Sequence, residues 1–314
     1  MGIVRFLKDW TLPVAIAVGT SVYLLFYWAP PLDAVGAQLS PLVDRLLPVT
    51  VFLTLFLTFC KVDFHQMLPH RWHAGVLGAQ LLLVGGCVGY ILAAGGNGEG
   101  RTVGEAVLTC IIGPSAAAAP VVTAKLGGNI STMTTYTVLS SVASALLIPL
   151  VFPLLEPAAS VTFVEAVFII MQKVAAVLLL PLVLGWAAQH YWKRLCRLVT
   201  SVPNLSFYTW AVSLSLTTGI TVKNIVHSEA SVTMLGLIAL ATMVLCLVQF
   251  LLGRLIGRRL GEEINAGQAL FQKNTALSIW VAYIYLNPVA SVGAGCYVLW
   301  QNIVNSLELR HVAK

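Results

Sequence analysis

Residues 109–124 read TCIIGPSAAAAPVVTA, an apolar segment interrupted from Gly113 to Pro120 by a glycine, two prolines and a run of small side chains. A second apolar segment is interrupted by the polar sequence QALFQKNT at residues 268–275. In hydrocarbon, a backbone polar group freed from a helix costs several kcal/mol unless protein or a water-filled cavity satisfies it. The interruptions lie about 153 positions apart, close to half of the 314 residues, so they occupy matching positions in two halves. Paired interruptions of this kind are typical of a transporter's binding site.

Hydrophobic residues make up 58% of the chain and charged residues only 10%, which excludes the charged surface of a soluble protein of this size. Apolar runs of bilayer-spanning length predict an all-α integral membrane protein with ten transmembrane helices. The connections 29–45 and 191–204 are too short for a soluble domain and are expected to be linkers. The predicted helices are 11–28, 46–60, 74–94, 103–124, 130–155, 162–190, 205–222, 231–253, 264–286 and 289–307.

The distribution of basic residues predicts the orientation of the chain. With the N-terminus placed inside, 13 of the 18 Lys and Arg residues fall on the inner side, including Lys193, Arg194 and Arg197. This excess follows the positive-inside rule and predicts a multi-pass protein of the cell inner membrane with both termini cytoplasmic. The net charge of +6 therefore reflects the orientation in the lipid bilayer, and no nucleic acid partner is expected.

Several short motifs carry a family resemblance. They are the stretch from Gly113 to Pro149 with its Gly128-Asn129 turn, Ala79-Gln80, Gln272, and Trp300-Gln301-Asn302-Ile303. In this order and spacing they resemble the bile acid:sodium symporter family over nearly the whole chain. The resemblance implies two inverted five-helix repeats, residues 1–157 and 158–314, whose broken fourth and ninth helices cross. It also implies a core domain that contains these helices and a panel domain against which the core moves.

The resemblance also indicates where this chain departs from sodium-binding relatives. Their crossover carries a Glu, a Gln and an Asn, and the Glu bridges two sodium sites. The matching positions here are Gln268, Gln272 and Lys273, followed by Asn274. The second site keeps Gln80 and Gln272 and can offer the carbonyls of Ala269 and Phe271, but it has lost its carboxylate. A hard cation without an anionic ligand is poorly compensated in low dielectric. Only a vestigial sodium site is expected at Gln80, Gln268 and Gln272, with no other metal and no cofactor.

The first sodium site of the family is reduced further. The resemblance places Ala119, Pro120, Met133 and Thr137 at its positions, and only the Thr137 side chain retains a hydroxyl oxygen. Thr137 is therefore the one candidate cation ligand of this set. Its alternative role is helix packing through small side chains, which is common in membrane helices.

Lys273 lies near the bilayer centre, where a charged lysine costs about 2.5–3.5 kcal/mol. In one interpretation its ammonium takes the place of a sodium ion. In another it pairs with a substrate carboxylate near the positive ends of the half-helices. A structural interpretation also remains open, in which Lys273 hydrogen-bonds to carbonyl groups of the other interruption.

Other polar residues are candidates for the cavity wall. Lys173 lies about eleven residues from either end of its predicted helix, so it either lines the cavity or reaches an interface with difficulty. Gln301 and Asn302 fall where the family places a His and an Asn beside substrate. Six hydroxyl residues of segment 205–222 either line a substrate path or pack a panel helix: Ser206, Thr209, Ser213, Ser215, Thr217 and Thr218.

These features together predict a secondary active transporter of a small organic anion, working by alternating access without the family's usual sodium coupling. The alternatives are a sodium-dependent symporter of bile-acid-like organic anions, and a channel or sensor that has kept the fold. No embedded carboxylate pair, His/Glu metal motif or activated nucleophile is visible, so an enzyme is not expected.

Overall fold

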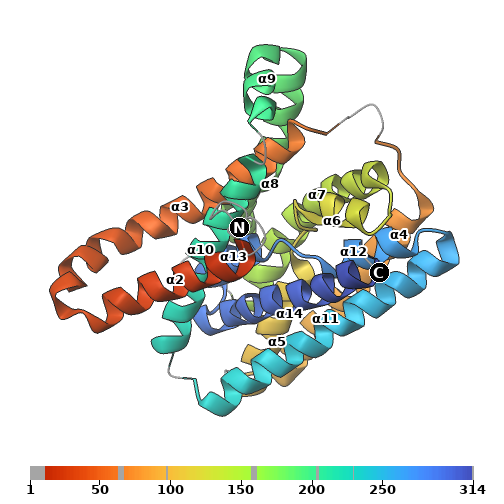
Figure 1. The fold of residues 1–314 in the computed structure, drawn as a ribbon. Coiled ribbons are helices and arrows are strands. Elements are labelled where there is room, and N and C mark those ends of the chain that lie inside the picture. The colour runs from red at the N-terminus through yellow and green to blue at the C-terminus, as the bar shows by residue number, and fades with distance from the viewer. Residues whose placement is uncertain are drawn as a thin grey trace.

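A computed structural model describes residues 11–62, 67–96, 98–156, 161–202, 205–228 and 230–312, which form helices joined by short connections (Figure 1). Five helical segments of this part of the chain are long and apolar enough to cross a membrane: Ala34–Phe59, Arg71–Ala94, Ile130–Leu155, Phe163–His190 and Val232–Leu260. In chain order the helices are α2 (Thr11–Trp28), η1 (Pro30–Leu32), α3 (Asp33–Phe59), α4 (Arg71–Ala94), α5 (Glu99–Ile112), α6 (Ala119–Lys125), α7 (Ile130–Leu155), α8 (Phe163–His190), α9 (Lys193–Ser201), α10 (Leu205–Val226), α11 (Val232–Leu260), α12 (Glu263–Phe271), α13 (Thr275–Tyr285) and α14 (Pro288–Val312).

Each predicted segment corresponds to a helix or to a broken pair of helices, with two differences in the connections. The expectation of a linker over 29–45 was wrong, because α3 already begins at Asp33 and contains Pro41 and Pro48. Prolines are tolerated in membrane helices where neighbouring groups satisfy the freed backbone. The second expected linker, 191–204, contains the short helix α9. The predicted boundary between the halves, at 157 and 158, lies outside the described residues.

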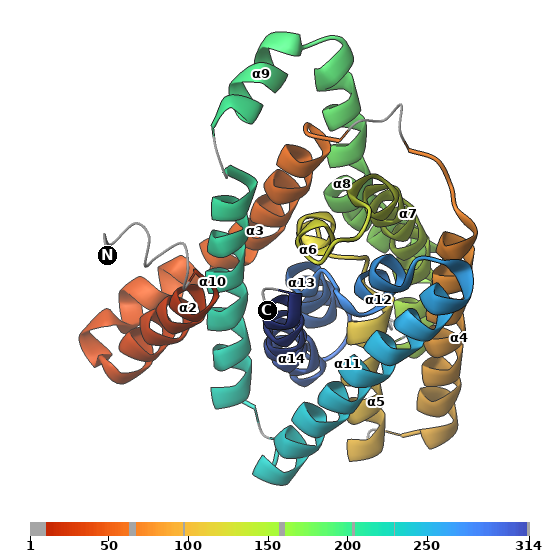
Figure 2. The same ribbon diagram turned by 45° about the vertical axis from the view of Figure 1, so that its right-hand side comes forward.

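We divide the helices into two groups, named after the panel and core domains that the resemblance implies. In the panel group, α10 packs against α2 and α3, and α3 packs against α8. In the core group, which comprises α4–α7 and α11–α14, α11 packs against α5, α12 and α14, and α4 packs against α5. Figure 2 shows α2, α3 and α10 on one side of α13 and α14, with α4, α5 and α11 on the other. The groups meet where α10 contacts α13 and α14 and where α7 contacts α8.

The two interruptions meet inside the core group. One separates α5 from α6, and the other separates α12 from α13. Ser115 and Lys273 form an antiparallel bridge, and the Ala116 N–H donates to the Gln272 carbonyl at 2.8 Å. Main-chain groups from the two halves of the chain thus satisfy each other, as a water-poor environment requires.

Candidate functional site

The first interruption is held by side chains that receive the free end of α5. The last carbonyls of a helix have no partner within it. Gln80 on α4 donates its Nε2 to the Ile111 carbonyl at 2.9 Å, and Ser144 on α7 donates its hydroxyl to the Ile112 carbonyl at 2.7 Å. The Gln80 Oε1 accepts from the Tyr136 hydroxyl at 3.4 Å. Gln80, a candidate sodium ligand from the sequence, is therefore engaged in capping α5.

The second interruption is held in a similar way from α14. The carbonyl of Phe271, the last residue of α12, accepts from the Tyr297 hydroxyl at 2.7 Å. Gln301 binds both main-chain groups of Lys273: its Oε1 accepts from the Lys273 N–H at 3.0 Å, and its Nε2 donates to the Lys273 carbonyl at 3.4 Å. Asn274 caps α13 by accepting a backbone N–H of its first turn at 3.3 Å. The structure thus brings Gln301 to the crossing, where it positions Lys273.

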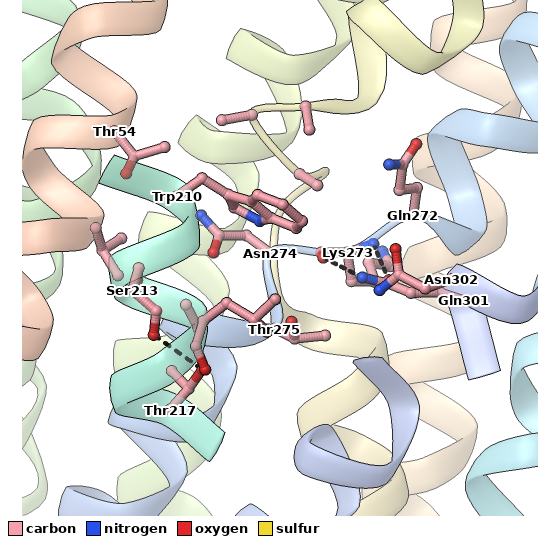
Figure 3. Close-up of a pocket in the computed structure, with 16 residues that line it drawn as sticks. Thr54, Trp210, Ser213, Thr217, Gln272, Lys273, Asn274, Thr275, Gln301 and Asn302 are labelled. Carbon is pink, nitrogen blue, oxygen red and sulfur yellow. Dashed lines mark hydrogen bonds between the residues drawn. The ribbon is translucent and has the colours of Figure 1, made fainter. Parts of the chain in front are cut away.

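A pocket lies beside this crossing, between the panel group and the core group (Figure 3). The Trp210 indole extends from α10 toward Asn274, and the hydroxyl-bearing Ser213 and Thr217 lie on the same helix (Figure 3). Five candidates from the sequence line the pocket from the core side: Gln272, Lys273, Asn274, Gln301 and Asn302. The panel side is formed by Val51, Thr54, Trp210, Ser213, Leu214 and Thr217. Of the six hydroxyl residues that the sequence indicated in segment 205–222, Ser213 and Thr217 line this pocket and the other four do not. Thr54 and Trp210 were missed.

Three polar groups of the pocket wall are buried without a hydrogen-bond partner among the described residues. They are the Lys273 ammonium, the Ser213 hydroxyl and the Gln272 Oε1. Lys273 is only 1% exposed, and the other interruption is bonded by the main chain of its neighbours Gln272 and Asn274, not by its ammonium. The structural interpretation of Lys273 therefore lacks its predicted contact. Leaving a buried polar group unsatisfied costs about 1–3 kcal/mol, and more for a charged group, so these three groups are candidates for contact with a polar or anionic ligand.

Gln268 faces a carboxylate that the sequence analysis did not identify. Its Nε2 donates to Glu308 Oε2 at 2.7 Å, and Arg254 pairs with the other carboxylate oxygen. The last helix was predicted to end just before Glu308, but it continues to Val312. Glu308 lies seven positions after Gln301, two helical turns along the same face, and this spacing could have indicated it.

The positions of the family's first sodium site do not reach the pocket. Ala119 and Pro120 are buried at the start of α6. The Thr137 hydroxyl donates to the Met133 carbonyl at 3.0 Å within α7, as expected for a hydroxyl that serves helix packing. Among the residues that the structure describes, no three His, Cys, Asp or Glu side chains are grouped closely enough to hold a metal ion.

Lys173 occupies a different place from Lys273. It lies on α8, and its ammonium is 5.8 Å from the centroid of the Tyr285 ring, a cation–π distance. It does not line the pocket described above. Its predicted role in the cavity wall is thus not supported in this arrangement of the helices.

Comparison with known proteins adds one finding to this geometry. A family model described as the sodium bile acid symporter family matches residues 48–228, which is more than half of the chain. The matched residues include the first interruption and the panel wall of the pocket, whereas the second interruption follows them. A search of curated proteins found no match.

Proposed function

Since the chain belongs to the sodium bile acid symporter family, we propose that it is a secondary active transporter of a small organic anion. It is a multi-pass membrane protein, and its family consists of transporters rather than enzymes. Transport works by alternating access, with the core group moving against the panel group. The paired interruptions support inverted repeats over residues 1–157 and 158–314, and the basic residues support an inner-membrane protein with cytoplasmic termini.

The observation that carries this proposal is the buried, unpaired ammonium of Lys273, a residue that lines the pocket. A compact lysine charge suits a compact anion such as a carboxylate. Ser213 faces the same pocket from the panel group and supplies a hydroxyl donor. The apolar remainder of the substrate packs against Leu214, Trp210 and the small side chains of residues 116–118. An anion bound between the panel group and the core group would pair with the Lys273 ammonium, which has no partner within the described part of the chain.

The same residues support coupling that differs from the family's usual use of sodium. Gln268 replaces the bridging carboxylate, and the Phe271 carbonyl and the Gln80 amide are engaged by protein groups. Glu308 supplies a carboxylate nearby, but Arg254 already pairs with it. Arg254 therefore neutralises the Glu308 carboxylate, the anionic ligand that a sodium ion would need.

The test is a thermal-stability screen of the purified protein with small organic anions, because a ligand that binds the folded state raises its apparent stability. Lys273→Gln should weaken binding of the best anion about tenfold or more, since a hydrogen bond to a charged group contributes about 1.5–3 kcal/mol. The ligand-free variant should melt at the same temperature as the wild type or higher, because the substitution removes a buried charge. Lys173→Gln is the matched control and should bind the anion normally.

Concentrative uptake into vesicles separates a carrier from a channel, and binding without flux would indicate a sensor. Uptake at the wild-type rate by the Lys273→Gln variant would refute the role of the Lys273 ammonium in transport. Sodium-dependent uptake recovered in the double variant Gln268→Glu, Lys273→Asn would favour an ammonium that replaces sodium over one that only pairs with substrate. A sodium-dependent symporter is the second candidate, because Glu308 places a carboxylate beside Gln268.

A further inference from the structure

α9 lies away from the transport pocket, in the connection between α8 and α10 of the panel group. Figures 1 and 2 both show it at one end of the molecule, beyond the end of α10. None of its residues lines the pocket, and none of its side chains is buried. A role for α9 therefore has to come from its own surface.

The nine residues of α9 divide into two faces. At about 100° per residue, its three charged side chains fall within one arc of about 100°, and its three branched apolar side chains fall within an equal arc on the other side. The basic face consists of Lys193, Arg194 and Arg197. The apolar face consists of Leu195, Leu198 and Val199. The helix contains no acidic residue, so all of its charge is positive.

Within the described part of the chain, no acidic side chain pairs with the basic face, and the apolar face is largely exposed. The five ion pairs there involve none of the three basic residues of α9. Among the described residues, Arg197 Nε donates only to the Lys193 carbonyl of the same helix, at 3.3 Å. On the apolar face, Leu198 is 67% exposed and Leu195 is 41% exposed. A short helix with an exposed apolar face beside an exposed basic face is typical of a segment that lies in a membrane interface.

The neighbours of α9 place it at the bilayer surface. It follows the apolar helix α8 after one turn, at a cluster of exposed aromatic residues that comprises Trp186, Tyr191 and Trp192. Such residues concentrate where membrane helices leave the hydrocarbon. On its flank, the Cys196 thiol donates to the Cys60 carbonyl at the end of α3, at 3.4 Å. This contact orients α9 against the panel group and leaves both faces open.

We infer that α9 binds the acidic phospholipid headgroups of the bilayer surface at this end of the protein. The basic face contacts the phosphates, and the apolar face enters the boundary of the acyl chains. Because α9 connects α8 to α10, this contact anchors the panel group to the membrane surface while the core group remains free to move. The inference concerns a lipid surface and does not depend on which substrate is carried. Each basic residue near an acidic surface strengthens binding about fivefold, so the three together make a strong preference for acidic lipid.

The test measures hydrogen exchange of the α9 amides by mass spectrometry, with the full-length protein in nanodiscs of phosphatidylcholine alone or mixed with phosphatidylglycerol. Exchange of the wild-type helix should be about tenfold slower or more in the acidic discs, and high salt should reduce the difference because it screens surface charge. The variant Lys193→Gln, Arg194→Gln, Arg197→Gln should lose the difference. The matched control, Arg71→Gln, Lys125→Gln, Arg259→Gln, removes the same charge from exposed positions elsewhere and should keep it.

The variant Leu195→Ser, Leu198→Ser separates the contributions of the two faces. It should exchange faster than the wild type in both kinds of disc, because it loses the apolar contact. Equal exchange of the wild-type helix in the two lipid mixtures would overturn the inference. So would retention of the acidic-lipid effect in the basic-face variant.

Discussion

Gln301 shows how one side chain supports a broken membrane helix. Its amide accepts from the N–H of Lys273 and donates to the carbonyl of the same residue. An amide is one of the few side chains that can do both, since it has an acceptor oxygen and donor hydrogens. Lys273 can therefore leave helical geometry within the membrane without leaving its own main chain unpaired.

We expect Gln301→Leu to lower the free energy of unfolding by about 1–3 kcal/mol, because the buried Lys273 N–H loses its partner. The Lys273 carbonyl keeps its bond from the Thr275 N–H at 3.0 Å. The measurement is the midpoint of thermal unfolding in a fixed detergent. Asn302→Leu is the control: its Nδ2 bonds the Val298 carbonyl within its own helix, so the change should be much smaller. An equal loss in both variants would show that Gln301 acts only through packing.

At the scale of the elements, α11 and α12 pack closely enough that a glycine is required between them. A Cβ placed on Gly253 would lie 2.5 Å from the Ala266 carbonyl oxygen and 3.0 Å from Gly267 Cα. Both obstacles are backbone, so a side chain at 253 would have to push α12, and with it Gln268, away from α11.

Gly253→Ala is expected to destabilise the protein by about 1–3 kcal/mol, the usual effect of overpacking. Gly236→Ala on the same helix is the matched control, because nothing lies within 4 Å of its Cβ. That variant should be neutral or more stable by up to about 1 kcal/mol, since alanine favours helix over glycine. Thermal melts of the two variants make the comparison. A stable Gly253→Ala variant would contradict the close approach.

For the whole molecule, the first prediction concerns coupling. Replacing sodium with choline should change anion binding or uptake less than about twofold, equivalent to under ~0.4 kcal/mol of coupling free energy. The reason is that Arg254 occupies the Glu308 carboxylate and Gln268 is neutral. If anion uptake depended steeply and saturably on sodium, this prediction would be wrong and the sodium-dependent symporter would be favoured.

The second whole-molecule prediction concerns orientation. Cys196 is partly exposed and lies between Arg194 and Arg197. An impermeant thiol reagent should modify it only from the cytoplasmic side, as the positive-inside rule requires. Cys60 is buried and should stay unmodified, so it serves as an internal control. Labelling from outside in sealed cells would reverse the proposed topology.

The helical class and the two interruptions followed from local chemistry. Proline and glycine weaken a helix locally and together interrupt it at Gly113-Pro114, and polar residues such as Lys273 are costly in hydrocarbon wherever they occur. These effects act within a few residues and can be read from one segment at a time. The start of α3 was predicted too late, because the effect of Pro41 on a helix depends on its neighbours in space and cannot be read from the local sequence.

The sequence by itself thus determined a helical membrane protein, its two broken segments and five residues on the core side of the pocket. Only the tertiary structure decided that Gln301 holds Lys273, that Glu308 faces Gln268, and that Trp210 and Thr54 close the pocket from the panel side. The physical reason is that hydropathy and helix-breaking act locally. Hydrogen bonds and pocket walls depend instead on which helices pack side by side, and a single sequence does not reveal that neighbour relation.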